Sequence, residues 1–183
     1  VIPIPYNAMV KEGIATYISD RPRLIRVILA LGDYYFPIME EIFDRNGLPV
    51  ELVYLTVVES ALNPFAVSRA GASGLWQFML PTGRSMGLTI NSLVDERFDV
   101  YKSSEAAALY LKQLYGLFDN WLLAIAAYNC GPGNVTKAIR RSGGKTTFWG
   151  VYPYLPRETR NYIPLFIGAY YACYYHNEHN ICP

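Results

Sequence analysis

The sequence predicts a single all-α domain. Its 183 residues are about the length of one domain, and its composition of 52% hydrophobic and 17% charged residues excludes a disordered chain. Apolar residues recur at helical spacing through most of the chain. Alternating runs of Val, Ile and Thr are missing from the sequence, so at most a short β-hairpin is expected, around residues 67–76.

Helix-starting and helix-ending residues divide the sequence into elements. Asp20 and Pro22 are typical of a helix N-terminus and predict a helix through residues 24–29. A further helix is expected through residues 38–43, ending near Asn46-Gly47. The remaining expected helices are residues 50–60 after Pro49, Pro81 to Gly87, 105–117 capped by Ser103, 121–128 capped by Asn120, 134–141 and 158–175.

Charge, hydropathy and cysteine content exclude several classes of protein. Sixteen Lys and Arg against fifteen Asp and Glu leave a net charge of +1, which gives no electrostatic footprint for nucleic acid. The largest apolar stretch, residues 163–175, contains Pro164 and is too short to span a membrane, so no transmembrane segment is expected in this chain. The 3 cysteines are too few for a disulfide framework, although Cys173 and Cys182 are near enough in sequence to form one disulfide.

The helix expected at residues 50–60 carries the candidate for catalysis. Residues 52–58 are apolar except for Thr56 and the hydroxyl of Tyr54, so this should be a buried central helix. Glu59 lies in its last turn, with no Lys or Arg within local reach on the helix. Burial and the negative end of the helix dipole both disfavour a carboxylate, so the pKa of Glu59 should be raised, as a general acid requires. The alternative is an ordinary glutamate that reaches solvent at a helix end.

Two further segments place polar residues beside turns. Gly71 and Gly74 allow another chain to approach closely, and Gln77 after them needs a hydrogen-bond partner if it is buried. Tyr128 and Asn129 precede a Gly-Pro-Gly turn, which presents an aromatic ring and an amide together. Taken alone, the first segment is a weak loop signal and the second also fits a plain helix C-cap.

A last segment, residues 155–164, places Glu158 and Tyr162 on one face of a helix because they are four residues apart. Taken alone, this segment also fits a capping arrangement at the protein surface. The order and spacing of all the segments together are more specific than any one of them. The motifs are, in order, Glu59-Ser60, GLWQFM at 74–79, AYNCGPGNV at 127–135 and ETRNYIP at 158–164. From about Gly47 to Pro164, the chain resembles the lytic transglycosylases of the goose-lysozyme-like superfamily, and in particular the membrane-bound lytic transglycosylase D group.

The resemblance implies a goose-type, lysozyme-like helical fold whose central buried helix carries the catalytic glutamate. Glu59 corresponds to the catalytic acid and base of the family. Ser68 corresponds to a residue that hydrogen-bonds the acetamido group or the reacting sugar. The other matching residues line the cleft or flank the reacting sugar, and they are Gln77, Met79, Tyr128, Asn129, Glu158 and Tyr162. The family commonly has methionine where this chain has Trp76, so this substitution is expected to reshape the cleft without abolishing it.

The resemblance also implies an activity. The chain is expected to cleave the MurNAc-β-1,4-GlcNAc bond of peptidoglycan without water, leaving 1,6-anhydro-MurNAc ends, with neither a metal nor another cofactor. The motifs supply Glu59 but no second carboxylate, since Asp95, Glu96 and Asp99 lie beyond them; most glycosidases need two. Its partner would be peptidoglycan glycan strands, and a monomer is favoured. Its location would be the cell envelope, either the periplasm or a membrane to which a segment outside this chain attaches it.

Other interpretations remain open. A goose-type lysozyme would hydrolyse the same bond with water, and a non-catalytic peptidoglycan-binding domain would lack the acid. His176, His179 and Cys182 could be read as metal ligands, but their spacing matches no zinc motif and a chance surface cluster is favoured. The single domain, residues 1–183, is expected to consist of a helical buttress at 1–46, a catalytic core at 47–164, and a helix end and tail at 165–183.

Overall fold

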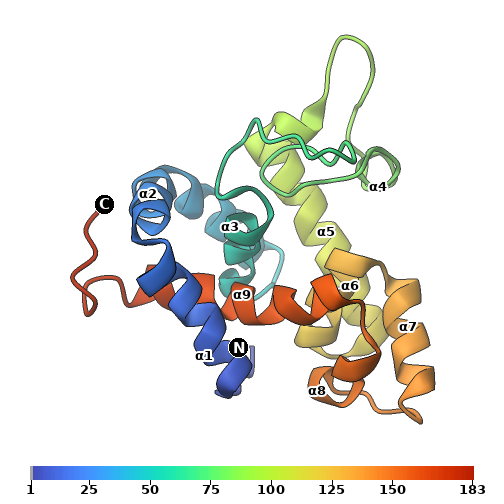
Figure 1. Cartoon of the computed structure of the whole chain (residues 1–183). Coiled ribbons are helices and arrows are strands. Elements are labelled where there is room, and N and C mark those ends of the chain that lie inside the picture. Colours follow the sequence, from blue (N-terminus) through green and yellow to red (C-terminus); the bar gives the residue numbers. More distant parts are fainter. Residues whose placement is uncertain (1) are drawn as a thin grey trace.

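The computed structural model describes residues 2–183 and confirms the all-α class (Figure 1). The α-helices are α1 (Ala8–Ala15), α2 (Pro22–Arg45), α3 (Leu55–Ser60), α4 (Leu80–Ser85), α5 (Val100–Phe118), α6 (Trp121–Cys130), α7 (Pro132–Arg141), α8 (Phe148–Val151) and α9 (Arg157–Tyr174). Shorter turns are the π-helix η1 (Thr16–Asp20) and the 3-10 helices η2 (Val50–Tyr54), η3 (Glu96–Phe98) and η4 (Tyr152–Tyr154). In the described residues the expected hairpin is reduced to isolated bridges, Val67 with Ser73 and Ser73 with Phe78.

The start of α2 differs from the prediction. Asp20 belongs to the π-helical turn η1, so Arg21 occupies the N-cap position and makes no capping bond with its side chain, while Pro22 opens the helix as expected. The helices expected at 24–29 and 38–43 are one continuous helix that passes through Pro37. Proline is tolerated there because residues 33 and 37 are both exposed, so the carbonyl that loses its N–H partner can reach water.

Of the N-caps predicted for α5 and α6, the first is wrong and the second is confirmed. Asp99, rather than Ser103, caps α5, because the carboxylate of Asp99 accepts from the backbone N–H of Lys102 at 2.8 Å. Ser103 is buried inside the first turn and donates to the carbonyl of Asp99 at 2.6 Å. Asn120 caps α6 as predicted, accepting from Leu123 N–H at 3.1 Å.

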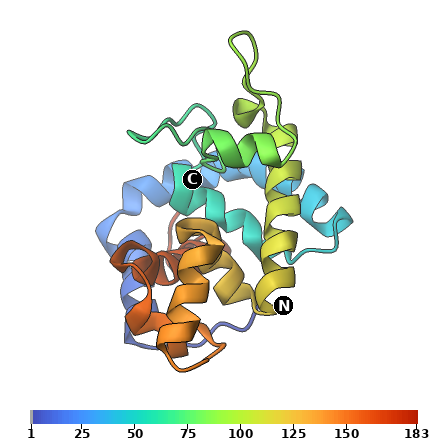
Figure 2. The ribbon, with the colours of Figure 1, turned by 90° about the vertical axis from the view of Figure 1, so that its right-hand side faces the viewer.

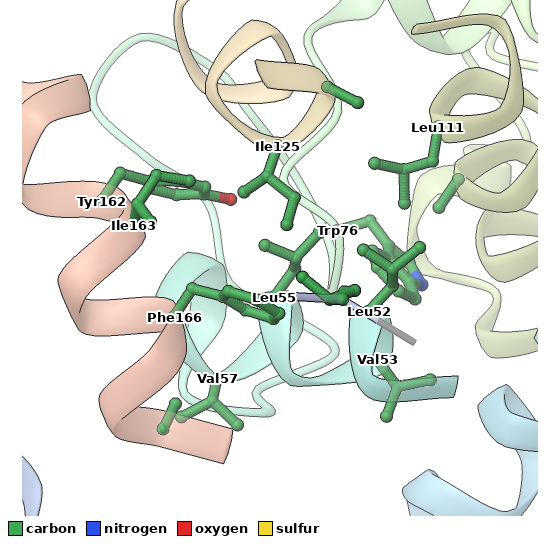
Figure 3. Close-up of a cluster of buried hydrophobic side chains, with 14 of the residues drawn as sticks. Leu52, Val53, Leu55, Val57, Trp76, Leu111, Ile125, Tyr162, Ile163 and Phe166 are labelled. Atoms are coloured by element: carbon green, nitrogen blue, oxygen red, sulfur yellow. The ribbon is translucent and has the colours of Figure 1, made fainter. Parts of the chain in front are cut away.

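The segment 50–60 forms the expected buried centre of the domain. Leu52, Val53 and Leu55 are fully buried, as part of a 3-10 turn that runs into α3. Figure 3 shows these side chains facing Trp76 from the loops, Ile125 from α6, and Ile163 and Phe166 from α9. The end of α3 is therefore held by apolar packing, in which each fully buried aliphatic side chain contributes roughly 1.5–3 kcal/mol.

One side of the domain is a helical wall, defined here as α1, η1, the start of α2, and α9. Figure 1 shows α1 running across α9. A Cβ atom on Gly13 would lie 2.1 Å from the carbonyl oxygen of Pro164, and one on Gly168 would lie 2.2 Å from the carbonyl oxygen of Gly13. Since real atoms cannot approach so closely, only glycine allows these two backbones to touch.

The opposite side is a loop wall, defined here as residues 61–99. Figure 2 shows its loops and α4 at one end of the molecule, beyond the helices of the core. Arg97, a residue that is only 8% exposed, holds these loops together. Its guanidinium pairs with Asp95 at 2.7 Å and donates to the carbonyls of Gly71 at 2.9 Å and Phe78 at 3.1 Å. The buried charge is thus paired and hydrogen-bonded, as burial requires.

The C-terminal region does not form the disulfide considered from the sequence. Cys130, Cys173 and Cys182 are all free, because Cys173 packs inside α9 while Cys182 lies exposed in the tail. His176 and His179 bond to a backbone carbonyl and a tyrosine hydroxyl, and residues 2–183 hold no cluster of three His, Cys, Asp or Glu side chains arranged to bind a metal. Among the helices of these residues, none combines the length and apolar character needed to cross a membrane.

Candidate active site

A cavity of about 800 Å³ lies between the loop wall and the helices α6 and α9. It is lined by every residue to which the sequence assigned a site role. They are Glu59, Ser68, Gln77, Met79, Tyr128, Asn129, Glu158 and Tyr162. The fold thus gathers side chains that are up to about a hundred residues apart in the chain, as the Tyr162–Glu59 contact illustrates with its separation of 103 residues.

The position of Glu59 follows from an abrupt end of α3. Ala61 and Leu62 have φ angles of 52° and 59°, in the left-handed region that residues other than glycine rarely adopt. Leu62 is fully buried, which fixes this reversal, and the hydroxyl of Ser60 donates to the carbonyl of Leu75 at 2.9 Å. Backbone strain of this kind persists only where the surroundings over-determine it, and here it follows directly on the candidate acid.

The surroundings of Glu59 favour its protonated form. Burial raises the pKa of Glu59 to about 7, and the nearby negative charge of Glu158 acts in the same direction. The hydroxyl of Tyr162 donates to Oε1 of Glu59 at 2.5 Å, which opposes the rise in pKa by stabilising the carboxylate. None of the salt bridges in residues 2–183 involves Glu59. A carboxyl with a pKa near neutrality can both give and take a proton at physiological pH.

Tyr128 is fixed by the loop wall rather than by Glu59. Its hydroxyl donates to the backbone carbonyl of Trp76 at 2.7 Å, and its ring lies 5.6 Å from the ring of Tyr110. The side chain of Trp76 lies in the core and is not among the residues that line the cavity. It is fully buried, stacks on Phe43 at 5.2 Å, and donates from its indole nitrogen to Ser104 at 2.9 Å. The larger ring is accommodated by the core beneath the cavity.

The amide of Gln77 satisfies the requirement predicted for a buried polar group. Its nitrogen donates to the carbonyls of Ala66 at 3.1 Å and Gly74 at 2.9 Å, while its backbone has a φ of 50°. Ser68 accepts from the N–H of Ala72 at 3.0 Å, which leaves its own hydroxyl hydrogen available to a ligand. These bonds hold the part of the loop wall that lines the cavity in one conformation.

Asn129 and Glu158 line the cavity from the helical side. The hydroxyl of Thr159 donates to Oδ1 of Asn129 at 2.9 Å, so the amide nitrogen of Asn129 is the group left for a ligand. Glu158 is exposed in the first turn of α9, on the same face as Tyr162, and both line the cavity as their spacing predicted.

The acids beyond the motifs have structural partners. Asp95 pairs with Arg97, Glu96 accepts from the N–H of Thr89 at 2.7 Å, and Asp99 caps α5. Among the residues lining the cavity, Glu59 and Glu158 are the only acids, and of these Glu158 is exposed while Glu59 is shielded.

Sequence reasoning missed several lining residues. Asn161 lies inside the ETRNYIP motif and could have been found there, whereas Tyr110 lies in the helix expected at 105–117, where no motif marked it as a site residue. A second cavity of about 470 Å³ adjoins Glu59 and is lined by Tyr17 and Arg21, for which no motif gave a signal.

The chain matches the family described as Transglycosylase SLT domain over residues 37–148. It is 41% identical over 165 residues to membrane-bound lytic murein transglycosylase D of Escherichia coli strain K12, in an alignment covering 88% of this chain and 36% of that protein. It is 34% identical over 110 residues to membrane-bound lytic murein transglycosylase F of Desulfosudis oleivorans, covering 56% of this chain and 23% of that protein. The chain therefore spans little more than a third of the length of the Escherichia coli protein and about a quarter of the Desulfosudis oleivorans protein.

The structure is also similar to solved structures. The 70 kDa soluble lytic transglycosylase of Escherichia coli gives a TM-score of 0.67 at 24% identity, over 92% of this chain and 31% of that chain. An inactive mutant of lytic transglycosylase Slt from Pseudomonas aeruginosa gives a TM-score of 0.64 at 25% identity, over 82% of this chain and 25% of that chain. These similarities confirm the lysozyme-like helical fold that the motifs implied. The chain belongs to the transglycosylase SLT domain family.

Proposed function

We propose that this domain is a peptidoglycan lytic transglycosylase that cleaves the MurNAc-β-1,4-GlcNAc bond and leaves 1,6-anhydro-MurNAc ends. The observation that carries the proposal is Glu59, a shielded carboxyl with a pKa of about 7, placed in a cavity with the other motif residues. The names of the relatives support the same activity. Because the relevant side chains all lie within residues 47–164, this segment is the proposed catalytic core.

In the first step, the protonated Glu59 gives its proton to the glycosidic oxygen while the 2-acetamido oxygen of the same MurNAc attacks C1. The bond from C1 to the glycosidic oxygen breaks, and a cyclic oxazolinium forms. A substrate-supplied nucleophile fits this site because the second lining carboxylate, Glu158, is exposed rather than shielded. Ser68 and the amide nitrogen of Asn129 would hold the sugar and its acetamido group in the reactive pose, which raises the effective concentration of the reacting atoms.

In the second step, the Glu59 carboxylate takes the proton of the C6 hydroxyl, whose oxygen attacks C1. The oxazolinium opens and restores the acetamide, so Glu59 is protonated again and no water is consumed. Tyr162 suits this alternation because its hydroxyl stabilises the carboxylate that exists between the two steps. Peptidoglycan as substrate implies work in the cell envelope, and we infer that location for the chain.

The product decides between this activity and that of a lysozyme. Purified peptidoglycan is digested in ¹⁸O-labelled water, and the released muropeptides are analysed by mass spectrometry. Unlabelled anhydro ends are expected, whereas labelled reducing ends as the main product would identify a hydrolase. Glu59→Gln is expected to lower turnover by about 10²–10⁴-fold or more with the fold intact, while Glu41→Gln, an exposed glutamate on α2, retains activity.

A further inference from the structure

The second cavity, of about 470 Å³, continues the first one across Glu59. The two share five lining residues, Val58, Glu59, Ser68, Gln77 and Leu165. The far side of the second cavity comes from the helical wall, which supplies Thr16, Tyr17, Arg21 and Leu24. A glycan strand bound over Glu59 would therefore meet the N-terminal segment on one side of the cleaved bond.

The N-terminal segment is held firmly at this place. The glycine crossing of α1 and α9 fixes its start, and the π-helical turn η1 leads from there to α2. Arg21 lies at the bend, where its carbonyl accepts from Leu24 at 3.0 Å and Ile25 at 3.2 Å. Single π-helical turns are frequent at functional sites, and this one sets both Tyr17 and Arg21 against the cavity.

Both side chains have unused binding capacity. Arg21 is exposed, and within residues 2–183 its guanidinium takes part in no salt bridge and donates no hydrogen bond. Tyr17 is 5% exposed as a residue, but its hydroxyl is not among the fully buried polar atoms, and it bonds to no group of the described chain. Burial raises the pKa of Tyr17 to about 12, so this hydroxyl remains a neutral donor at physiological pH.

A cation and a neutral hydroxyl donor that line one cavity are complementary to a carboxylate, which accepts charge-assisted hydrogen bonds. The shared wall contributes Glu59, whose protonated form does not repel an anion. The remaining lining is mostly apolar, so Arg21 is the cation that the cavity offers to an anion.

We propose that the second cavity binds a carboxylate carried by the glycan strand beside the cleaved bond, with Arg21 as the cationic partner and Tyr17 as a hydrogen-bond donor. This inference rests on the proposed function. N-acetylmuramic acid carries a lactyl ether whose carboxyl is free on a stripped strand and is amide-linked to a peptide on an intact one, and that peptide has carboxylates of its own. The two residues thus determine specificity for acidic glycans over neutral ones.

Binding to the Glu59→Gln protein, which does not consume the ligand, tests the proposal by isothermal titration calorimetry. The ligands are a MurNAc-GlcNAc tetrasaccharide with its peptides, the same tetrasaccharide after enzymatic removal of the peptides, and chitotetraose, which has no carboxylate. Adding Arg21→Gln is expected to raise Kd about tenfold for carboxylate-bearing ligands, as loss of a charged hydrogen bond does, and Tyr17→Phe about three-fold. Arg23→Gln, two residues along and outside the cavity, is the matched control with unchanged Kd.

The outcomes separate the sources and the hypotheses. A loss confined to the stripped ligand assigns the lactyl carboxylate, a loss confined to the intact ligand assigns a peptide carboxylate, and either supports the proposal. An unchanged Kd for Arg21→Gln, or an equal loss for chitotetraose, overturns it. A wild-type protein that releases no anhydro ends refutes the proposed function instead, and the digestion in labelled water reveals this independently of Arg21.

Discussion

Where α1 crosses α9, two backbones touch through Gly13 and Gly168; across the cavity, residues 61–99 are held by the guanidinium of Arg97 and the amide of Gln77. The helical wall thus depends on close apolar packing, which leaves no room for an additional atom. The loop wall depends on a few buried polar side chains that satisfy several carbonyls each. Glu59 lies between them, at the end of the central helix.

The two kinds of support should fail differently. Helix packing in the core belongs to the most stable, cooperative part of a domain, so damage to it lowers the stability of the whole chain. A loop segment organised by polar bonds can open locally while the helices stay folded. Substitutions in the two walls should therefore separate global stability from the shape of the cavity.

The largest effect is expected from Gly168→Ala. The added Cβ would lie 2.2 Å from the carbonyl oxygen of Gly13, so α1 must move away from α9. We expect a loss of about 3 kcal/mol or more in the free energy of unfolding, measured by urea denaturation. Gly116→Ala is the control, because that glycine has open space around it in the last turn of α5, and alanine there should stabilise the helix by up to about 1 kcal/mol. Equal stability of the two variants would show that the crossing is not tight.

Arg97→Met is expected to have the next largest effect. It removes the guanidinium that pairs with Asp95 and takes one of two donors from the carbonyls of Gly71 and Phe78, which keep only their bonds from Ser73. This should cost about 2–4 kcal/mol. Hydrogen exchange should rise throughout the loop wall and stay unchanged in α1 and α9, and cleavage of peptidoglycan should fall sharply. Arg69→Met, at an exposed position of the same wall, is the control. Uniform exchange over all helices would contradict local opening.

The sequence predicted the helical part of this molecule well, because helix periodicity and caps such as Asn120 are local signals. It predicted neither the continuity of α2 through Pro37 nor the capping of α5 by Asp99. At these two places, solvent exposure and contacts with neighbouring segments determine where the helix continues and which residue caps it. Neither factor is visible in a local sequence pattern.

For the candidate site, the motifs led to one cavity because each is a short segment with its own turn chemistry. The core position of Trp76 could not be predicted, since stacking on Phe43 is a contact between distant segments. The same holds for Arg97, Tyr17 and Arg21, whose importance depends on which backbone or cavity they meet after folding.

Between the two walls, the burial of Glu59 should appear as a pH dependence of stability. Its pKa is about 7 in the folded chain against 4.5 ordinarily, so the folded state binds the extra proton and loses stability as pH rises from about 4.5 to 7. Glu59→Gln has no such proton. Between pH 4 and pH 8, the wild type should therefore lose about 3 kcal/mol of unfolding free energy relative to the Glu59→Gln variant, or several degrees in Tm. Glu41→Gln should show no such difference. If Glu59→Gln also shows none, folding does not shift the pKa of Glu59 from its ordinary value.

The smallest effect is expected where the helical wall touches the acid itself. Tyr162 donates from α9 to Glu59 and lowers its pKa, so Tyr162→Phe removes a bond that favours the carboxylate and should raise the pKa of Glu59 further. Because the first step needs the protonated acid, the alkaline limb of kcat/KM should move to higher pH, by about half a unit to one unit. The measurement is the pH dependence of peptidoglycan clearing between pH 5 and 9.

Tyr128→Phe supplies the matched comparison from the other side of the cavity. It also removes one phenolic oxygen, but that oxygen donates to the carbonyl of Trp76 in the loop wall and not to Glu59. The alkaline limb of the pH profile of Tyr128→Phe should therefore stay at the wild-type pH even if the rate falls, because the Glu59 carboxylate neither gains nor loses a hydrogen bond. A limb that moves equally in both variants would mean that cavity shape, rather than the bond from the helical wall, sets the pKa of the acid.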